Sequence, residues 1–191
     1  MNVDAHNPLG RRALAVPLVA AFGLALLLSA GRPAPGAASS GTNITQTIEV
    51  KSLQDGQAIA RSKATLHRKP DRLSVHVRTS ELEPGEVVDV FWAVFDNPSA
   101  CIHGNPVTGV PCGPPDLFVE ATDATVQLVT TLTADSSGRL AYSASIAVGD
   151  TSGCVAGLPC GDGVTNPLGA EVHSAMFNAA GGRQAAQFLT P

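Results

Sequence analysis

Residues 87–98 read Val-Val-Asp-Val-Phe-Trp-Ala-Val-Phe-Asp-Asn-Pro, and they hold the only tryptophan of the chain and two of its six phenylalanines. β-Branched and aromatic residues dominate the segment, and no glycine or proline precedes position 98, a composition typical of a β-strand. The face opposite Trp92 carries Phe91 and Phe95 and is mostly apolar, and the face with Trp92 is wholly apolar: Val88, Val90, Trp92 and Val94. A strand that is apolar on both faces is usually covered on both. We therefore expect this segment to be the central strand of the fold.

On either side, short segments of alternating or β-branched residues predict further strands. They span residues 44–50, 58–68, 73–78, 125–133, 139–148, 169–178 and 183–190. Within residues 125–133 we expect Val126, Leu128 and Leu132 to share one face. Tight turns between several segments favour antiparallel neighbours, and no segment predicts a helix. The predicted fold is all-β, an immunoglobulin-like antiparallel β-sandwich of about eight strands, with a Greek-key barrel as the alternative.

The N-terminal segment has the pattern of a secretory signal peptide. Arg11 and Arg12 precede an uncharged, largely apolar run over residues 13–30, and small residues follow. This order of basic, apolar and small residues predicts a signal peptide over residues 1–38, with an uncleaved membrane anchor as the alternative. Residues 39–57 are expected to form a linker and a possible edge strand, and residues 58–191 the β-sandwich domain. The predicted location is secreted, periplasmic or cell-surface.

The charge of the remaining chain excludes some partners. Without residues 1–38 the chain has nine basic and fifteen acidic residues, a net charge of −6. This balance is a poor match for nucleic acid or an anionic membrane, so the expected partner is an extracellular ligand or protein. Basic residues crowd into residues 61–78 and acidic residues follow over 81–89. We interpret the two groups as opposite charges on neighbouring strands and turns.

Four cysteines in an exported chain predict disulfides. Cys101 and Cys112 bracket one Gly/Pro-rich loop, Cys154 and Cys160 bracket another, and both loops end in Pro-Cys-Gly. We expect these two local bonds, although a bond between the loops, such as Cys112 to Cys160, is an alternative. A zinc site built from Cys101, His103 and Cys112 is a further alternative, but the spacing matches no strong zinc pattern. No cofactor or metal is expected.

We expect the functional residues to lie in the two disulfide-closed loops, because proteins with a rigid β-scaffold usually place their binding residues in loops. The nucleophile elbow, the His-Glu-x-x-His pattern and the phosphate loop are all missing from the sequence, so a non-enzymatic binding or structural module is the leading interpretation. The alternative is a secreted hydrolase or metal-binding protein that uses Glu171, His173 and His103. The candidate binding residues are His103, Asn105, Asp116, Asp162, Glu171 and His173.

Three segments carry a resemblance to known proteins. They are residues 92–101 (Trp-Ala-Val-Phe-Asp-Asn-Pro-Ser-Ala-Cys), 111–116 (Pro-Cys-Gly-Pro-Pro-Asp) and 166–173 (Asn-Pro-Leu-Gly-Ala-Glu-Val-His). Together they resemble a family of uncharacterised secreted bacterial β-sandwich proteins over about residues 64–177, which implies export and a sandwich but no activity. Residues 172–174 (Val-His-Ser) and 181–182 (Gly-Gly) are also similar to the chordin-type CHRD domain. That family has a paired-histidine motif where residues 101–104 offer only His103.

Overall fold

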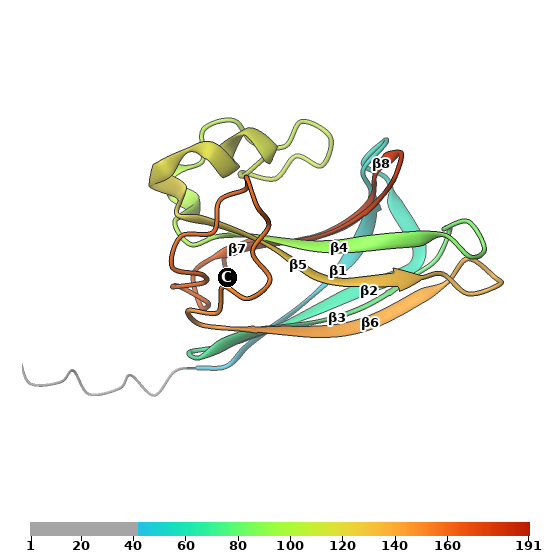
Figure 1. The fold of residues 1–191 in the computed structure, drawn as a ribbon, viewed down its shortest axis with the longest axis horizontal. Helices are drawn as coiled ribbons and strands as arrows, with labels where there is room; N and C mark the ends of the chain where they lie inside the picture. The colour runs from blue at the N-terminus through green and yellow to red at the C-terminus, as the bar shows by residue number, and fades with distance from the viewer. Residues whose placement is uncertain (1–41) are drawn as a thin grey trace, which may run out of the picture. The chain divides into compact units, whose positions relative to one another are not determined.

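The computed structural model describes residues 42–191, which form an all-β domain (Figure 1). Its eight strands are β1 (Ile44–Ser52), β2 (Ala58–Lys69), β3 (Arg72–Thr79), β4 (Val87–Phe95), β5 (Ala124–Thr133), β6 (Leu140–Ala147), β7 (Glu171–Asn178) and β8 (Gly181–Phe188). Three short 3-10 helices lie between β4 and β5: η1 (Pro98–Ala100), η2 (Pro114–Phe118) and η3 (Glu120–Thr122). The predicted antiparallel all-β fold of about eight strands is confirmed.

All eight strands belong to one antiparallel sheet, in the order β5-β4-β7-β8-β1-β2-β3-β6. The two halves of the predicted sandwich are therefore halves of a single sheet, which curls so that its end strands β5 and β6 approach each other (Figure 1). Strand β4 pairs with β5 on one side and β7 on the other. This interior position matches the strand that the sequence analysis placed at the centre.

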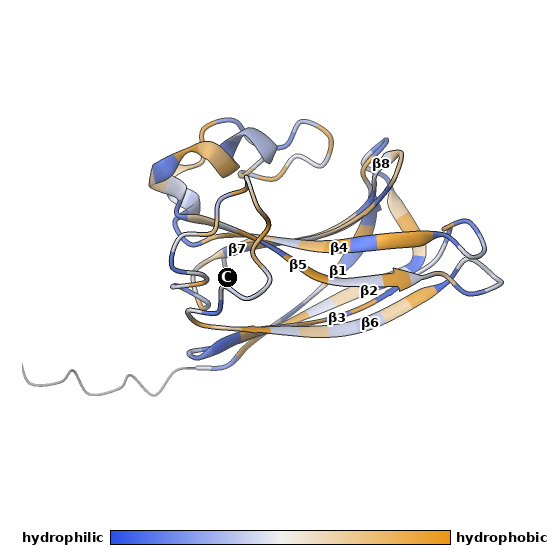
Figure 2. Ribbon diagram, in the orientation of Figure 1, coloured by the Kyte–Doolittle hydropathy of each residue, from blue (hydrophilic) through white to orange (hydrophobic). Residues whose placement is uncertain are grey.

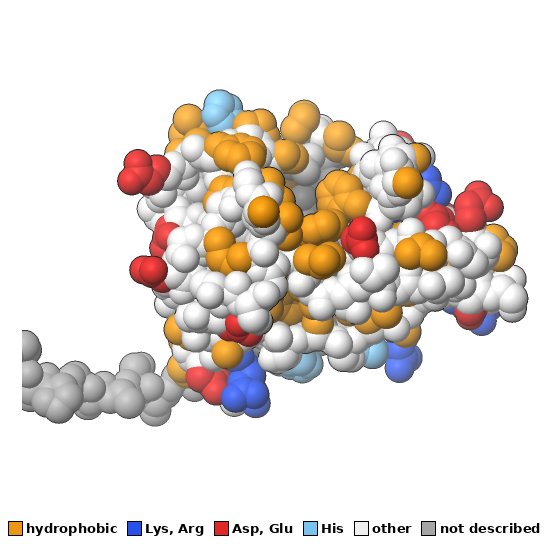
Figure 3. Space-filling view, in the orientation of Figure 1, with side chains coloured by type: hydrophobic (Ala, Val, Ile, Leu, Met, Phe, Trp, Pro, Cys, Tyr) orange, Lys and Arg blue, Asp and Glu red, His pale blue; other side chains and the backbone are white. Residues whose placement is uncertain are grey.

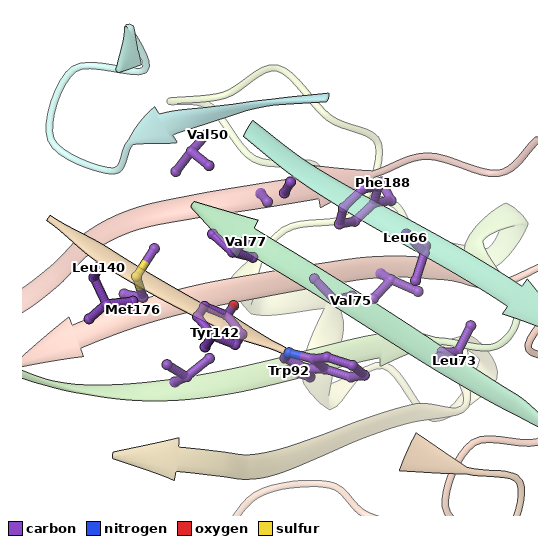
Figure 4. Close-up of a cluster of buried hydrophobic side chains, with 14 of the residues drawn as sticks. Val50, Leu66, Leu73, Val75, Val77, Trp92, Leu140, Tyr142, Met176 and Phe188 are labelled. Atoms are coloured by element: carbon purple, nitrogen blue, oxygen red, sulfur yellow. The ribbon is translucent and has the colours of Figure 1, made fainter. Parts of the chain in front are cut away.

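The core fills the space enclosed by the curled sheet, and every strand contributes to it (Figure 4). Trp92 from β4, Leu66 from β2 and Phe188 from β8 are all fully buried there. The hydroxyl groups of Tyr142 on β6 and Ser174 on β7 form a hydrogen bond across the core. In Figure 2 the strands are largely orange or pale, and the β2–β3 turn is blue. This distribution follows from the period-two alternation, because every second side chain of a strand points inward.

The outer face of β4 is only partly covered, which corrects the expectation of a strand covered on both faces. Phe95 is buried beneath Cys112 and Ala124. Phe91 is half-buried, and Val87 is 56% exposed. Strand β1 does not cover these residues, because Ile48 and Val50 pack on the inner core instead. The reason is that residues 42–191 form no second layer outside β4, and the loop that follows β4 covers Phe95 but leaves Val87 exposed.

The prediction that Val126, Leu128 and Leu132 share one face of their strand is wrong, because β5 contains a β-bulge. Val90 of β4 pairs with Thr130, but the next residue, Phe91, pairs with Leu128, so Val129 is an extra residue. Such an insertion moves the side chains on its two sides to opposite faces of the sheet. Leu132 accordingly packs on the core, whereas Leu128 is exposed. Val126 lines the outer surface.

Strand β1 is an interior strand and not the predicted edge strand, so the β-domain begins before residue 58. It pairs with β2 over most of its length and with β8 through Lys51 and Ser52. β1 and β8 diverge beyond these two pairs, which leaves residues 44–50 paired on one side only. The predicted signal peptide lies outside residues 42–191. Within that range the structure has no helix long and apolar enough to cross a bilayer.

Candidate functional site

Both predicted disulfides are present. Cys101 bonds to Cys112, with Cα atoms 5.2 Å apart, and Cys154 bonds to Cys160, with Cα atoms 5.8 Å apart. All four cysteines are therefore paired within their own loops. Each bond closes a Gly/Pro-rich segment that has little regular hydrogen bonding of its own.

The buried carboxylate of Asp116 organises the first disulfide loop. It accepts four backbone N–H groups, those of Ile102 (2.9 Å), His103 (3.0 Å), Gly104 (3.0 Å) and Gly113 (2.8 Å). Burial by itself raises the pKa of Asp116, but the four donors outweigh it and hold this pKa below its usual value. Asp116 is one of the predicted ligand-binding residues. In the structure its hydrogen-bonding capacity is used to shape the loop.

The second disulfide loop covers the outer edge of β5. The backbone N–H groups of Val126 and Leu128 donate to Pro159 and Gly153 of this loop, each at 2.8 Å. Asp96, directly after β4, fixes the end of the loop by accepting the N–H groups of Thr165 at 2.9 Å and Asn166 at 2.8 Å. Burial raises the pKa of Asp96 in spite of these donors. The loop thus protects the outer edge of β5, where no neighbouring strand among residues 42–191 pairs with the backbone.

Glu171 and His173 join the first loop to β7. Their side chains form a hydrogen bond of 2.7 Å, in which Nε2 of His173 donates to Oε1 of Glu171. The same oxygen accepts the backbone N–H of Cys112 at 3.2 Å. Glu171 is buried, and the His173 ring packs edge-on against Phe95 with centroids 5.3 Å apart. The pair therefore anchors the stapled loop to the sheet.

Beside this anchor lies an apolar groove on the outer face of β4, β7 and β8, with a volume of about 480 Å³. On its floor the rings of Phe91 and Phe177 meet edge to face, with centroids 5.7 Å apart. Leu117 and Leu158, from the segments around the two disulfides, form part of its walls, and Leu53 lines it from the β1–β2 turn. Figure 3 shows hydrophobic side chains gathered around this hollow. We call it the groove.

Three polar side chains line the groove, and none of its lining residues is Asp, Glu, Lys or Arg. Asn105 uses its Oδ1 atom to accept the backbone N–H groups of Val107 and Thr108. Gln187 places its Nε2 atom 3.5 Å from Nδ1 of His173. Its Oε1 atom is buried and has no hydrogen-bond partner among residues 42–191.

The structure brings some of the predicted binding residues together and separates others. Asn105 and His173 both line the groove, and Glu171 lies directly behind His173. His103 and Asp162 are exposed and do not line it. No group of three or more His, Cys, Asp or Glu side chains within residues 42–191 is arranged to hold a metal ion.

Sequence reasoning missed Phe177, Gln187 and the leucines of the groove. Phe177 lies in a predicted strand, and its outward position follows from the alternation with buried Met176. The leucines lie far apart in sequence, so no local pattern connects them. Comparison of the chain with models of protein families, with curated proteins and with solved structures finds no match. The resemblance to secreted bacterial β-sandwich proteins remains a prediction.

Replacing Asp116 by asparagine is expected to lower the free energy of unfolding at pH 7 by about 2–3 kcal/mol, because an amide is a weaker acceptor for buried backbone donors than a carboxylate. The pKa of Asp116 is depressed in the folded state. Its contribution is therefore fully present above the unfolded pKa of about 3.8 and is lost as the pH falls through the folded value.

The difference between the wild type and Asp116→Asn should accordingly shrink below about pH 3.8, as measured by urea unfolding from pH 7 to pH 2.5. Asp96 titrates in both proteins and cancels in the comparison. Asp162→Asn is the matched control, because Asp162 is exposed and should change stability by less than about 0.5 kcal/mol. A pH-independent difference for Asp116→Asn would contradict the assignment.

Proposed function

We propose that this protein is a secreted, non-enzymatic binding module that holds an uncharged, largely apolar small ligand in the groove. The observation that carries the proposal is the lining, which has an aromatic floor, leucine walls and no Asp, Glu, Lys or Arg. A charged ligand would lose its hydration there without gaining a counterion. The volume of about 480 Å³ lies in the range of sites for small molecules.

The position of the groove also supports binding. Apolar side chains on the open face of a sheet normally gain a covering layer, and Phe177 is still 37% exposed. The disulfides and the buried Asp116 keep the neighbouring loop in shape without ligand, which limits the ordering cost of binding. Asn105, His173 and Gln187 supply a few polar atoms that would orient a ligand. The two disulfides support the proposed extracellular location.

The alternative of a hydrolase or metal-binding protein gains no specific support. It requires Glu171 and His173 to act together with His103. Glu171 is buried and already accepts hydrogen bonds from His173 and Cys112. His103 is exposed on the loop, and only its backbone N–H contacts the carboxylate of Asp116.

Phe177→Ala is expected to weaken binding of an uncharged apolar probe such as Nile red by about tenfold, because the probe loses an aromatic contact on the groove floor. Fluorescence titration of the protein measures this dissociation constant. Phe118→Ala is the matched control, since Phe118 is 68% exposed and lies outside the groove. Equal losses for the two variants, or tighter binding of an anionic probe of similar size, would refute the proposal.

A further inference from the structure

Most basic side chains of the domain gather on one surface. Of the nine Lys and Arg residues within residues 42–191, six lie on or beside the outer face of β2, β3 and β6: Arg61, Lys63, Lys69, Arg72, Arg78 and Arg139. All six are exposed. Blue Lys and Arg and pale-blue His side chains accordingly mark the lower margin of Figure 3, over β3 and β6. We call this surface the cationic face.

Two of the acidic residues that follow in sequence contact other parts of the domain and do not pair with this face. Glu86 forms its ion pair with Arg183 at 3.0 Å, and Asp89 accepts a hydrogen bond from Thr131. The acidic residues that do lie near the cationic face are Glu49, Asp71 and Asp135. Among residues 42–191, the one ion pair on this face joins Arg72 to the neighbouring Asp71 at 2.8 Å.

Strand register places like charges directly opposite each other on this face. Lys63 of β2 pairs with Arg78 of β3, and Lys69 pairs with Arg72 at the other end of the same two strands. Side chains opposite each other in an antiparallel pair are close neighbours, and like charges there destabilise the sheet. The fold keeps two such pairs in a domain that has a net negative charge. Each pair has one carboxylate beside it, since Glu49 lies opposite Lys63 and Asp71 forms an ion pair with Arg72. An anion bound between them would relieve the repulsion.

The two like-charge pairs, Lys63 with Arg78 and Lys69 with Arg72, form two cationic rows, and a polar surface without Phe, Tyr or Trp separates them. Lys69 lies six positions after Lys63 along β2, so the rows are about 20 Å apart. Between the rows, the side chains of His76 and Ser143 form a hydrogen bond of 2.8 Å, and the Ser74 hydroxyl donates a hydrogen bond of 3.2 Å to Ser145. Hydroxyl and imidazole groups line this middle section: Thr65, His67, Ser74, His76, Ser143 and Ser145. An extended ligand with anionic groups and many hydroxyls would match the two separated cationic rows and the polar section between them.

The row that contains Lys63 and Arg78 lies beside Arg61, whose backbone is strained. Arg61 has φ of 60°, a conformation that costs energy for a residue with a side chain. It lines a hollow of about 580 Å³ together with Arg78 and Arg139, and Asp135 also lies there. Side-chain hydrogen bonds stabilise the segments next to this hollow. Thr79 donates to Ser62 at 3.1 Å, and Gln184 donates to the carbonyl of Ser80 at 2.8 Å.

We propose that the cationic face binds an anionic polysaccharide. Sulfate or carboxylate groups meet the hollow of Arg61, Arg78 and Arg139 and the row at Lys69 and Arg72, and sugar hydroxyls meet the Ser, Thr and His side chains between them. Single-stranded nucleic acid fits less well, because stacking of its bases relies mainly on Phe, Tyr and Trp, and the strands of this face, as residues 42–191 show them, carry none of these on their outer side. The face lies outside the groove, so the proposal is independent of the ligand proposed there.

The test measures binding of the protein to immobilised dextran sulfate, to polygalacturonate and to neutral dextran at low and physiological salt, with single-stranded DNA as a competitor. The wild type should bind one or both anionic polymers at least tenfold more tightly than neutral dextran, and added salt should weaken this binding. The double variant Arg78→Gln/Arg139→Gln should weaken it at least tenfold and flatten its salt dependence. Which polymer binds distinguishes sulfate from carboxylate recognition.

The matched control is Ala121→Glu/Ala156→Glu, which changes the net charge by the same amount at exposed positions in the two long loops. It should bind within about twofold of the wild type, because a distant charge is screened by salt. Equal losses in the two double variants would overturn the proposed site. Binding no tighter than to neutral dextran would overturn the proposal, and tighter competition by DNA than by either polysaccharide would overturn the choice of ligand. Circular dichroism and thermal midpoints verify that each variant is folded.

Discussion

Arg68→Met is expected to lower the free energy of unfolding by about 3–5 kcal/mol, because it leaves several buried acceptors without a donor, at about 1–3 kcal/mol each. Arg68 is fully buried, and burial lowers its pKa to about 10. Its guanidinium donates to the carbonyl oxygens of Pro167 (3.1 Å), Ala170 (2.7 Å) and Leu189 (3.0 Å) and to Oε1 of Gln46 (3.0 Å). Methionine fills a similar volume but leaves these acceptors without a donor.

The loss should appear as a lower urea midpoint with an unchanged slope, followed by the fluorescence of the single tryptophan. Lys69→Met is the matched control, because Lys69 is the next residue and is exposed, so its replacement should change stability by less than about 0.5 kcal/mol. Arg68 joins β2 to the segment before β7 and to the end of β8. Equal midpoints for the two variants would show that these hydrogen bonds do not stabilise the fold.

Trp92→Ala should cost about 3–5 kcal/mol, the usual range for a large buried aromatic side chain. Trp92 is fully buried on β4 and packs in the enclosed core with side chains from the other half of the sheet (Figure 4). Alanine would leave a cavity that the curled sheet closes only in part, because β4 is held between β5 and β7. Unfolding is followed by circular dichroism, since the variant has no tryptophan.

Arg139→Ala serves as the control for Trp92→Ala, because Arg139 is exposed and should change stability by less than about 0.5 kcal/mol. Similar unfolding midpoints for the two variants would mean that the core is misplaced. The Arg68 and Trp92 substitutions also test different contributions to the free energy of unfolding. One removes charge-assisted hydrogen bonds, and the other removes apolar contacts.

The groove and the cationic face use different strands of the one sheet. The groove lies on the outer side of β4, β7 and β8, and the cationic face lies on that of β2, β3 and β6. Phe177→Ala should therefore leave polysaccharide binding unchanged, and the arginine variant should leave Nile red binding unchanged. Loss of both activities in either variant would indicate a fold defect and not a local effect.

Much of this fold follows from local patterns in the sequence. Alternation of apolar and polar residues, together with β-branched and aromatic composition, predicted eight strands close to their observed bounds. The shared Pro-Cys-Gly endings predicted both disulfides. The same alternation also places Arg68 on the inner face with Ala64 and Leu66, a signal that sequence reasoning overlooked.

Only the tertiary structure decided which faces and charges meet. The extra residue Val129 reverses the faces of β5, and the choice of neighbouring strands brings Lys63 opposite Arg78. The groove combines residues as distant as Leu53 and Gln187, and Asp116 proved to be a buried loop anchor. The physical reason is the distance along the chain between the residues that interact. Strand formation depends on side chains a few residues apart, whereas register, bulges and buried hydrogen bonds depend on contacts between segments that no local pattern connects.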